Sequence, residues 1–92
     1  MSPLPLDSEQ TIYQVATTHE QLSAALLAGQ PLVLDLSTIE ECDTSFVQLL
    51  LWLQAKCREK QQPLALGDPS PRLAALLAQL GLADALTFGR AE

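Results

Sequence analysis

The side chains that could perform chemistry in this chain are one histidine, two cysteines and a small set of carboxylates. His19 falls in the first turn of a predicted helix, where a surface position is usual, and no nucleophile accompanies it. Cys42 and Cys57 match no zinc-ligand spacing, so we interpret both as reduced thiols, with Cys57 packed as a small hydrophobic residue. The four glycines are dispersed, so a glycine-rich phosphate loop is excluded. We therefore expect no metal and no cofactor.

Two aspartates, Asp35 and Asp43, are candidates for a catalytic carboxylate pair. Asp35 ends a predicted buried strand and Asp43 precedes a long predicted helix, so the two carboxylates could approach each other at the carboxyl edge of a sheet. Capping accounts for Asp43 more simply, because an aspartate before a helix accepts hydrogen bonds from free N–H groups of the first turn. Glu40 and Glu41 are expected to form a solvated acidic edge. This pattern holds no catalytic constellation, so we expect a protein that is not an enzyme.

Composition and charge restrict the class of protein further. The chain has 92 residues, 48% hydrophobic and 17% charged, which predicts a single globular domain over residues 1–92. Its net charge is −6, and residues 1–55 contain seven acidic residues and neither lysine nor arginine. Nucleic acids and anionic membranes are therefore unsuitable partners, since both require clustered basic residues. A basic partner would find its complement on the N-terminal half.

The sequence also predicts where the protein acts. Its first ten residues, MSPLPLDSEQ, have neither the basic start nor the apolar run of a secretory signal. The longest uninterrupted apolar stretch, Leu49–Leu53, is much too short to cross a membrane. We therefore expect a cytoplasmic protein without direct membrane insertion.

Strand-like and helix-like segments alternate along the chain. The strands are predicted over Thr11–Val15, which could pair with Leu4–Leu6, over Leu32–Leu36 and over Leu64–Leu66. Helices are predicted from a capping box at Thr17–Glu20 to Gly29, from Thr44 to about Lys60, and over Arg72–Leu80. Ser70 and Pro71 suit the cap and first position of that last helix, and Gly81 ends it. The order predicts an α/β fold, a small, mostly parallel β-sheet of four to five strands flanked by three to four α-helices.

The longest predicted helix has more apolar surface than a single buried face requires. Its main stripe consists of Phe46, Leu50, Leu53 and Cys57, and further apolar residues lie on the other sides. Two interpretations remain open: either the helix lies deep in a small core, or one face docks a partner. On the second interpretation Trp52 is the candidate anchor, because large aromatic side chains are favoured at interfaces.

The segment LVLDLSTIEECDTSFVQLLLWLQ joins a hydrophobic strand, an acidic loop and a helix opened by Asp-Thr. With QQPLAL as the next strand and DPSPRLAALLAQLGL as the last helix, this order resembles the STAS domain (sulphate transporter and anti-sigma factor antagonist). The resemblance covers residues 11–86. It implies a STAS-like fold and, for proteins of the antagonist type, a non-enzymatic adaptor that binds a serine kinase or anti-sigma factor.

The resemblance also implies the site residues. The family's phosphorylated hydroxyl directly follows the aspartate that opens the long helix, which here is Thr44, with Ser45 as the second choice. The partner-binding residues expected at this helix start and its loop are Glu40, Glu41, Asp43, Thr44, Phe46 and Val47, and Trp52 joins them as the candidate anchor from the apolar face of the helix. In the family a small residue often precedes Gly-Leu after the phosphosite, whereas here Ser45 is followed by Phe46 and Val47. The bulk of Phe46 predicts either a specialised partner or a lost switch.

Three functions compete on this reading. The first is an adaptor in a bacterial partner-switching pathway, possible outputs being a sigma factor or a chemotaxis array, switched by phosphorylation of Thr44. The second is a structural accessory subunit that binds the ATPase of a lipid-transport ABC complex without a switch. The third, an enzyme or small-ligand carrier, rests only on the pair Asp35 and Asp43. Self-association is left open.

Overall fold

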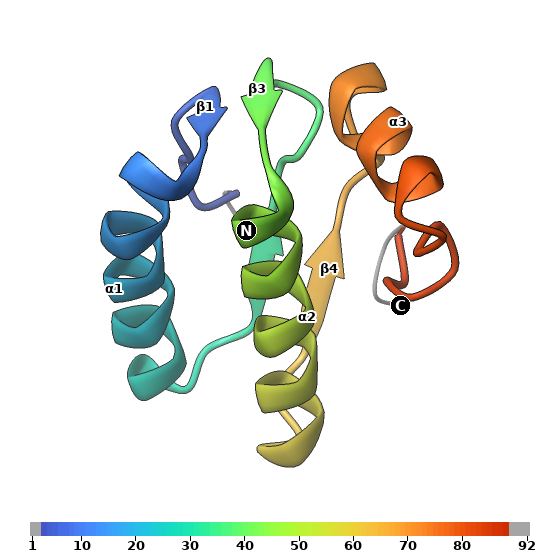
Figure 1. The fold of residues 1–92 in the computed structure, drawn as a ribbon. Coiled ribbons are helices and arrows are strands. Elements are labelled where there is room, and N and C mark those ends of the chain that lie inside the picture. The colour runs from blue at the N-terminus through green and yellow to red at the C-terminus, as the bar shows by residue number, and fades with distance from the viewer. Residues whose placement is uncertain (1–2, 89–92) are drawn as a thin grey trace.

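A computed structural model describes residues 3–88 of the chain, so residues 1–2 and 89–92 of the predicted domain lie outside it. In Figure 1 the helices lie across one side of short strands. The elements in chain order are β1 (Glu9–Gln10), α1 (Ile12–Ala28), β2 (Leu32–Leu34), β3 (Glu41–Cys42), α2 (Thr44–Glu59), β4 (Leu64–Leu66) and α3 (Pro71–Gln79).

The strands form two small parallel sheets, so the predicted α/β class is confirmed while the predicted single sheet is not seen. Strand β1 pairs with β3, and β2 pairs with β4 so that Leu34 lies opposite Leu66. Leu4 adds a parallel bridge to Leu34, which places β2 between two neighbours. Leu36 lies beyond the end of β2, yet its side chain is fully buried. The four described strands are only two or three residues long.

The start of α1 differs from the sequence-based prediction. Thr11–Val15 is not a strand: Thr11 caps a helix that begins at Ile12, and the Gln14 side chain accepts a hydrogen bond from the Thr11 backbone N–H, 3.1 Å away. The predicted capping box at residues 17–20 lies inside that helix. Thr11 and Gln14 have the same capping-box spacing and form the N-terminal cap of α1. With the helix starting there, Val15 lies within it and packs against the core. Gly29 ends the helix in the left-handed conformation (φ 74°), as predicted.

The second half of the chain follows the prediction closely. Helix α2 begins at Thr44 after the cap residue Asp43, and α3 begins at Pro71 after the cap residue Ser70. The Ser70 hydroxyl accepts a hydrogen bond from the Leu73 N–H, 3.1 Å away. Strand β4 spans the predicted residues, whereas β3 lies in a stretch predicted to be loop.

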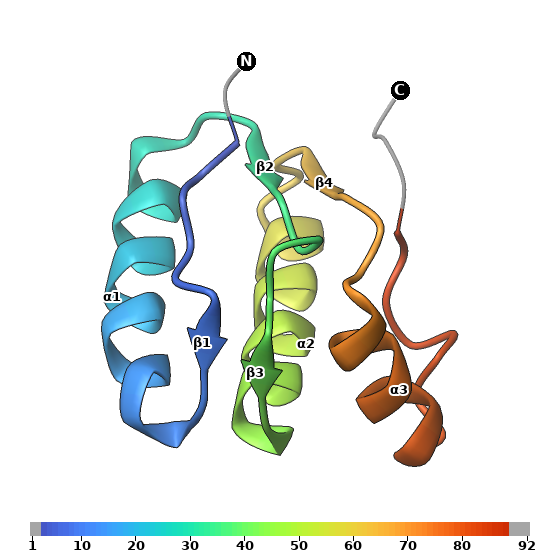
Figure 2. The same cartoon turned by 90° about the horizontal axis from the view of Figure 1, so that it is seen from above.

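Helix α2 lies at the centre of the core. Its predicted stripe is buried: Phe46, Leu50 and Leu53 are completely covered, and Cys57 is nearly so. Leu49, on another side of the helix, is also buried, because α1 packs alongside α2. In Figures 1 and 2, α1 lies on one side of α2 and α3 on the other, and in Figure 1 the strands β2 and β4 lie behind α2. These neighbours explain why α2 is apolar on nearly every side.

The segment that follows α3 is tied to α2 by one buried glutamine. The Gln54 side-chain amide donates to the Ala85 carbonyl (2.9 Å) and accepts from the Thr87 N–H (2.9 Å). Between these two bonds, Leu86 places its side chain in the core. Gln54 thereby satisfies backbone groups that would otherwise be unpaired beside the core.

Leu34→Asp is expected to unfold the protein. Leu34, the last residue of β2, is 0% exposed and pairs with both Leu66 and Leu4, and burying an unpaired carboxylate costs several kcal/mol against a total stability of roughly 5–10 kcal/mol. Circular dichroism and a thermal melt measure the effect. The matched control is Leu27→Asp, because Leu27 on α1 is 84% exposed and should tolerate the same change. A Leu34→Asp protein that melts like the wild type would contradict this placement.

Candidate functional site

The three helices begin at the same end of the molecule. In Figures 1 and 2 the first turns of α1, α2 and α3 lie near the short strands β1 and β3. This arrangement follows from parallel strands joined by helices, which bring the carboxyl ends of strands and the N-termini of helices together. The predicted site residues Glu40, Glu41, Asp43 and Thr44 all belong to this end.

Asp43 joins two of the helix starts. One carboxylate oxygen accepts from the Ser45 N–H (3.0 Å) and from the Ser45 hydroxyl, and the other accepts from the Ile12 N–H (2.9 Å) at the start of α1. The Ser45 hydroxyl, with help from the N–H groups of Ile12, Ser45 and Phe46, lowers the pKa of Asp43. The charged carboxylate is therefore a shared cap for α1 and α2.

The two candidate hydroxyl groups lie in different surroundings. Thr44, the first residue of α2, is exposed. Ser45 is half-buried and its hydroxyl is already bound to Asp43. This difference agrees with the choice of Thr44 over Ser45 as the hydroxyl available to another protein, but phosphorylation itself stays a prediction.

Phe46 and Val47 are the two predicted partner-binding residues whose placement must be corrected. Both side chains are 0% exposed and belong to the core. Neither can touch a partner through its side chain, and the bulk of Phe46 does not cover Thr44.

The acidic edge is exposed, as predicted. Glu40 and Glu41 have exposed side chains, while their N–H groups both donate to the Ser8 carbonyl and attach this edge to the segment before β1. The Glu41 carboxylate also lies 3.6 Å from the Arg72 guanidinium of α3, as an exposed ion pair. Such a pair contributes little to stability, so Glu41 remains available to a partner.

The remaining chemical candidates are separate from one another. Asp35 accepts from the N–H (3.0 Å) and hydroxyl (2.6 Å) of Ser37, and these bonds lower its pKa, so Asp35 serves its own turn whereas Asp43 links α1 and α2. Cys42 and Cys57 are buried, which raises the pKa of both thiols. Among residues 3–88, no three His, Cys, Asp or Glu side chains come together as a possible metal site.

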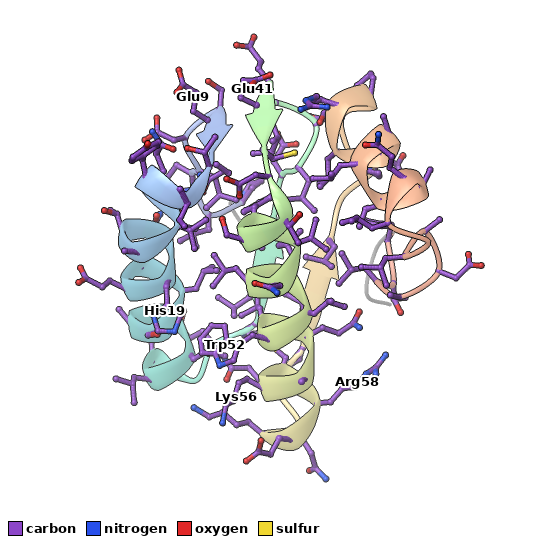
Figure 3. The ribbon with its side chains drawn as sticks, in the orientation of Figure 1. Glu9, His19, Glu41, Trp52, Lys56 and Arg58 are labelled. Carbon is purple, nitrogen blue, oxygen red and sulfur yellow. The ribbon has the colours of Figure 1, made fainter. Side chains whose placement is uncertain are left out.

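A groove between α1 and α2 extends from this end of the molecule. Its volume is about 610 Å³, and it is lined by Ile12, Val15, Ala16, His19, Glu20, Ser45, Gln48, Leu49 and Trp52. The predicted anchor Trp52 is half-buried here, and its ring centroid lies 4.5 Å from that of His19 (Figure 3). The sequence-based prediction does not include the wall of the groove formed by the first turns of α1, because it assigns Thr11–Val15 to a strand. The signal that could have revealed it is the Thr11–Gln14 capping box followed by Val15, Thr18 and Leu22 at helical spacing.

Comparison with protein families identifies the class of protein. Small parallel strands covered by helices that start at one end, with Asp-Thr opening the central helix, define a STAS-type α/β domain. The family model described as "Mlab, STAS domain" matches residues 2–87, and the chain belongs to this family. No match was found among curated proteins. Domains of this class generally mediate protein–protein interactions. None of the helices within residues 3–88 combines the length and hydropathy needed to cross a membrane.

Asp43→Asn is expected to destabilise the protein by about 1 kcal/mol near neutral pH, because an asparagine has one acceptor oxygen for the N–H groups of Ser45 and Ile12 and carries no charge at the helix N-termini. The folded-state pKa of Asp43 is lowered, so its ionised form contributes fully above the unfolded pKa of about 3.9, and the contribution is lost as the pH falls through the folded pKa. The difference between wild type and variant should therefore shrink in acid. Urea denaturation at about pH 7 and about pH 3 measures it.

The control for this comparison is Asp68→Asn, in the exposed loop before α3. This variant should stay within about 0.5 kcal/mol of the wild type at neutral pH. A neutral-pH loss that is equal for both variants would show that Asp43 has no special role in joining the helices.

Proposed function

We propose that the protein is a non-enzymatic cytoplasmic adaptor that binds a protein partner through the end of the molecule where α2 begins. The observation that carries this proposal is the exposed Thr44 at the start of α2. It follows Asp43, which is hydrogen-bonded to both α1 and α2, and the Phe46 side chain beside it is buried in the core. A hydroxyl and an acidic edge are thus presented on a fixed frame. Family membership supports an interaction role, since STAS domains generally bind other proteins.

Position and charge make Thr44 suitable as a switch for this adaptor. A phosphate there would add about two negative charges beside Asp43, Glu40 and Glu41. Within the free domain this charge is tolerated, because Thr44 is exposed and lies at the positive end of the helix dipole. Beneath a partner the same group would be desolvated, and an uncompensated charge costs several kcal/mol, enough to weaken binding about a thousandfold. We propose phosphorylation of Thr44 by a partner kinase as the step that ends the complex, as in partner switching.

A second function, an accessory subunit that binds the ATPase of a lipid-transport ABC complex, is favoured by a different observation. Both oxygens of the Asp43 carboxylate are already occupied by N–H and hydroxyl groups of α1 and α2. A phosphate on Thr44 would compete with Asp43 for the first N–H groups of α2. An end built in this way suits permanent binding at least as well as a switch.

Thr44→Glu is expected to fold normally and lose the partner, whereas Thr44→Val should fold normally and bind permanently. The tagged variants are expressed in the native cell, and each captured partner is identified by mass spectrometry. Phosphopeptide mapping of the wild-type protein tests whether Thr44 is modified. A kinase, an anti-sigma factor or a chemotaxis protein would support the switching adaptor, and an ABC ATPase would support the accessory subunit.

The matched controls are Thr17→Glu and Thr17→Val, because Thr17 is an exposed threonine in the middle of α1. Both should capture the partner as the wild type does. Equal recovery with glutamate and valine at position 44, without phosphate on Thr44, would remove the switch and leave the accessory subunit. Recovery of no specific protein by the wild type would contradict the adaptor itself.

A further inference from the structure

The groove between α1 and α2 is an apolar surface that the core does not fill. Its floor is formed by Val15 of α1 and Leu49 of α2, and Ile12, 68% exposed, lies at one end. His19 and Trp52 face each other across it (Figure 3). Tyr13, 88% exposed, follows Ile12 and extends the apolar surface of the first turn of α1. Contiguous exposed apolar surface of this kind marks interaction sites.

The walls of the groove favour a helix as its occupant. All the residues that line the groove belong to the two helices, so no free strand edge lines it. An extended peptide would find no backbone partners there for its own N–H and C=O groups, whereas a helix satisfies these groups internally. Two helices packed side by side also present ridges between which the side chains of a third helix can insert.

Charge determines the kind of helix. Glu20 is the only carboxylate among the residues that line the groove, and none of these residues is a lysine or arginine. The segment from Pro3 to Ala55, which contributes all these residues, contains no lysine or arginine. The labelled acidic residues Glu9 and Glu41 lie toward the end where the helices begin (Figure 3). The groove therefore complements a helix with a positive charge beside its apolar stripe.

We infer that the groove between α1 and α2 receives an amphipathic helix of a partner protein, with apolar side chains against Leu49 and Trp52 and a lysine or arginine opposite Glu20. The inference rests on the adaptor function proposed above and specifies the partner's binding element. Glu20 is eight residues along α1 from Ile12, which is about 12 Å. A cation paired with Glu20 therefore lies too far away to neutralise a phosphate on Thr44, so groove binding and the switch are compatible.

The test uses Trp52, the single tryptophan of the chain, as a fluorescent reporter in the groove. The probe is a synthetic 14-residue helical peptide without tryptophan, with leucines at helical spacing and lysines beside them. Its partner probe replaces every lysine by glutamate. At low salt we expect the cationic peptide to shift the emission of the full-length chain to the blue in a saturable titration. It should bind roughly fivefold tighter than the anionic peptide.

Two pairs of variants localise the binding. Ala16→Arg places a long side chain in the groove and should weaken the cationic peptide roughly tenfold, whereas Ala24→Arg makes the same charge change at an exposed position of α1 outside it. Glu20→Lys should reverse the preference between the two peptides, whereas Asp84→Lys, at an exposed position after α3, should not. Thermal melts show which variants are folded, so a lost titration in a folded Ala16→Arg protein can be attributed to the groove.

Three results would overturn the inference. The first is the absence of a saturable shift with either peptide, and the second is equal binding of both peptides. The third is a wild-type dimer in analytical ultracentrifugation that Ala16→Arg dissociates and Ala24→Arg does not, because the occupant would then be a second copy of this chain. These measurements need no native partner. If the Thr44 variants behave as proposed while the peptides fail to bind, the adaptor stands and only the groove assignment falls.

Discussion

The Asp43 carboxylate holds the first turns of α1 and α2 together, and the arrangement of the interaction surface depends on this link. One oxygen caps α2 at Ser45 and the other binds Ile12 at the start of α1. Ile12 and Asp43 are 31 residues apart along the chain, so this one carboxylate links the first turns of two helices that are distant in sequence. Thr44 and the mouth of the groove are both positioned by it.

Burial of α2 on nearly all sides explains which of its residues are left for function. Phe46 and Val47 are completely buried, Leu49 is buried on the side where α1 packs, and the segment after α3 is attached through Gln54. The accessible residues of α2 include its first residue, Thr44, and the strip facing the groove, where Trp52 is half-buried. The proposed partner contacts lie at this helix end and in the adjoining groove.

Helix ends with a capping residue could be predicted from the amino-acid sequence alone. Asp43 before α2, Ser70 and Pro71 before α3, and Gly29 after α1 are signals that act within one turn, so they are legible without the rest of the chain. Thr44 as the exposed hydroxyl followed from the same signals together with the family resemblance. The predicted start of α1 is wrong because Thr11–Val15 has both strand propensity and a capping box. Local sequence preferences favour both structures at these residues.

Which side chains face the core, and which helices pack against each other, could be learned only from the three-dimensional structure. It turned Phe46 and Val47 inward, since the rotation of α2 against the strands depends on packing with residues far along the chain. It also brought His19 of α1 to Trp52 of α2 and so created the groove. No local pattern contains this information, because a helix's periodicity describes its faces but does not say which element covers each of them.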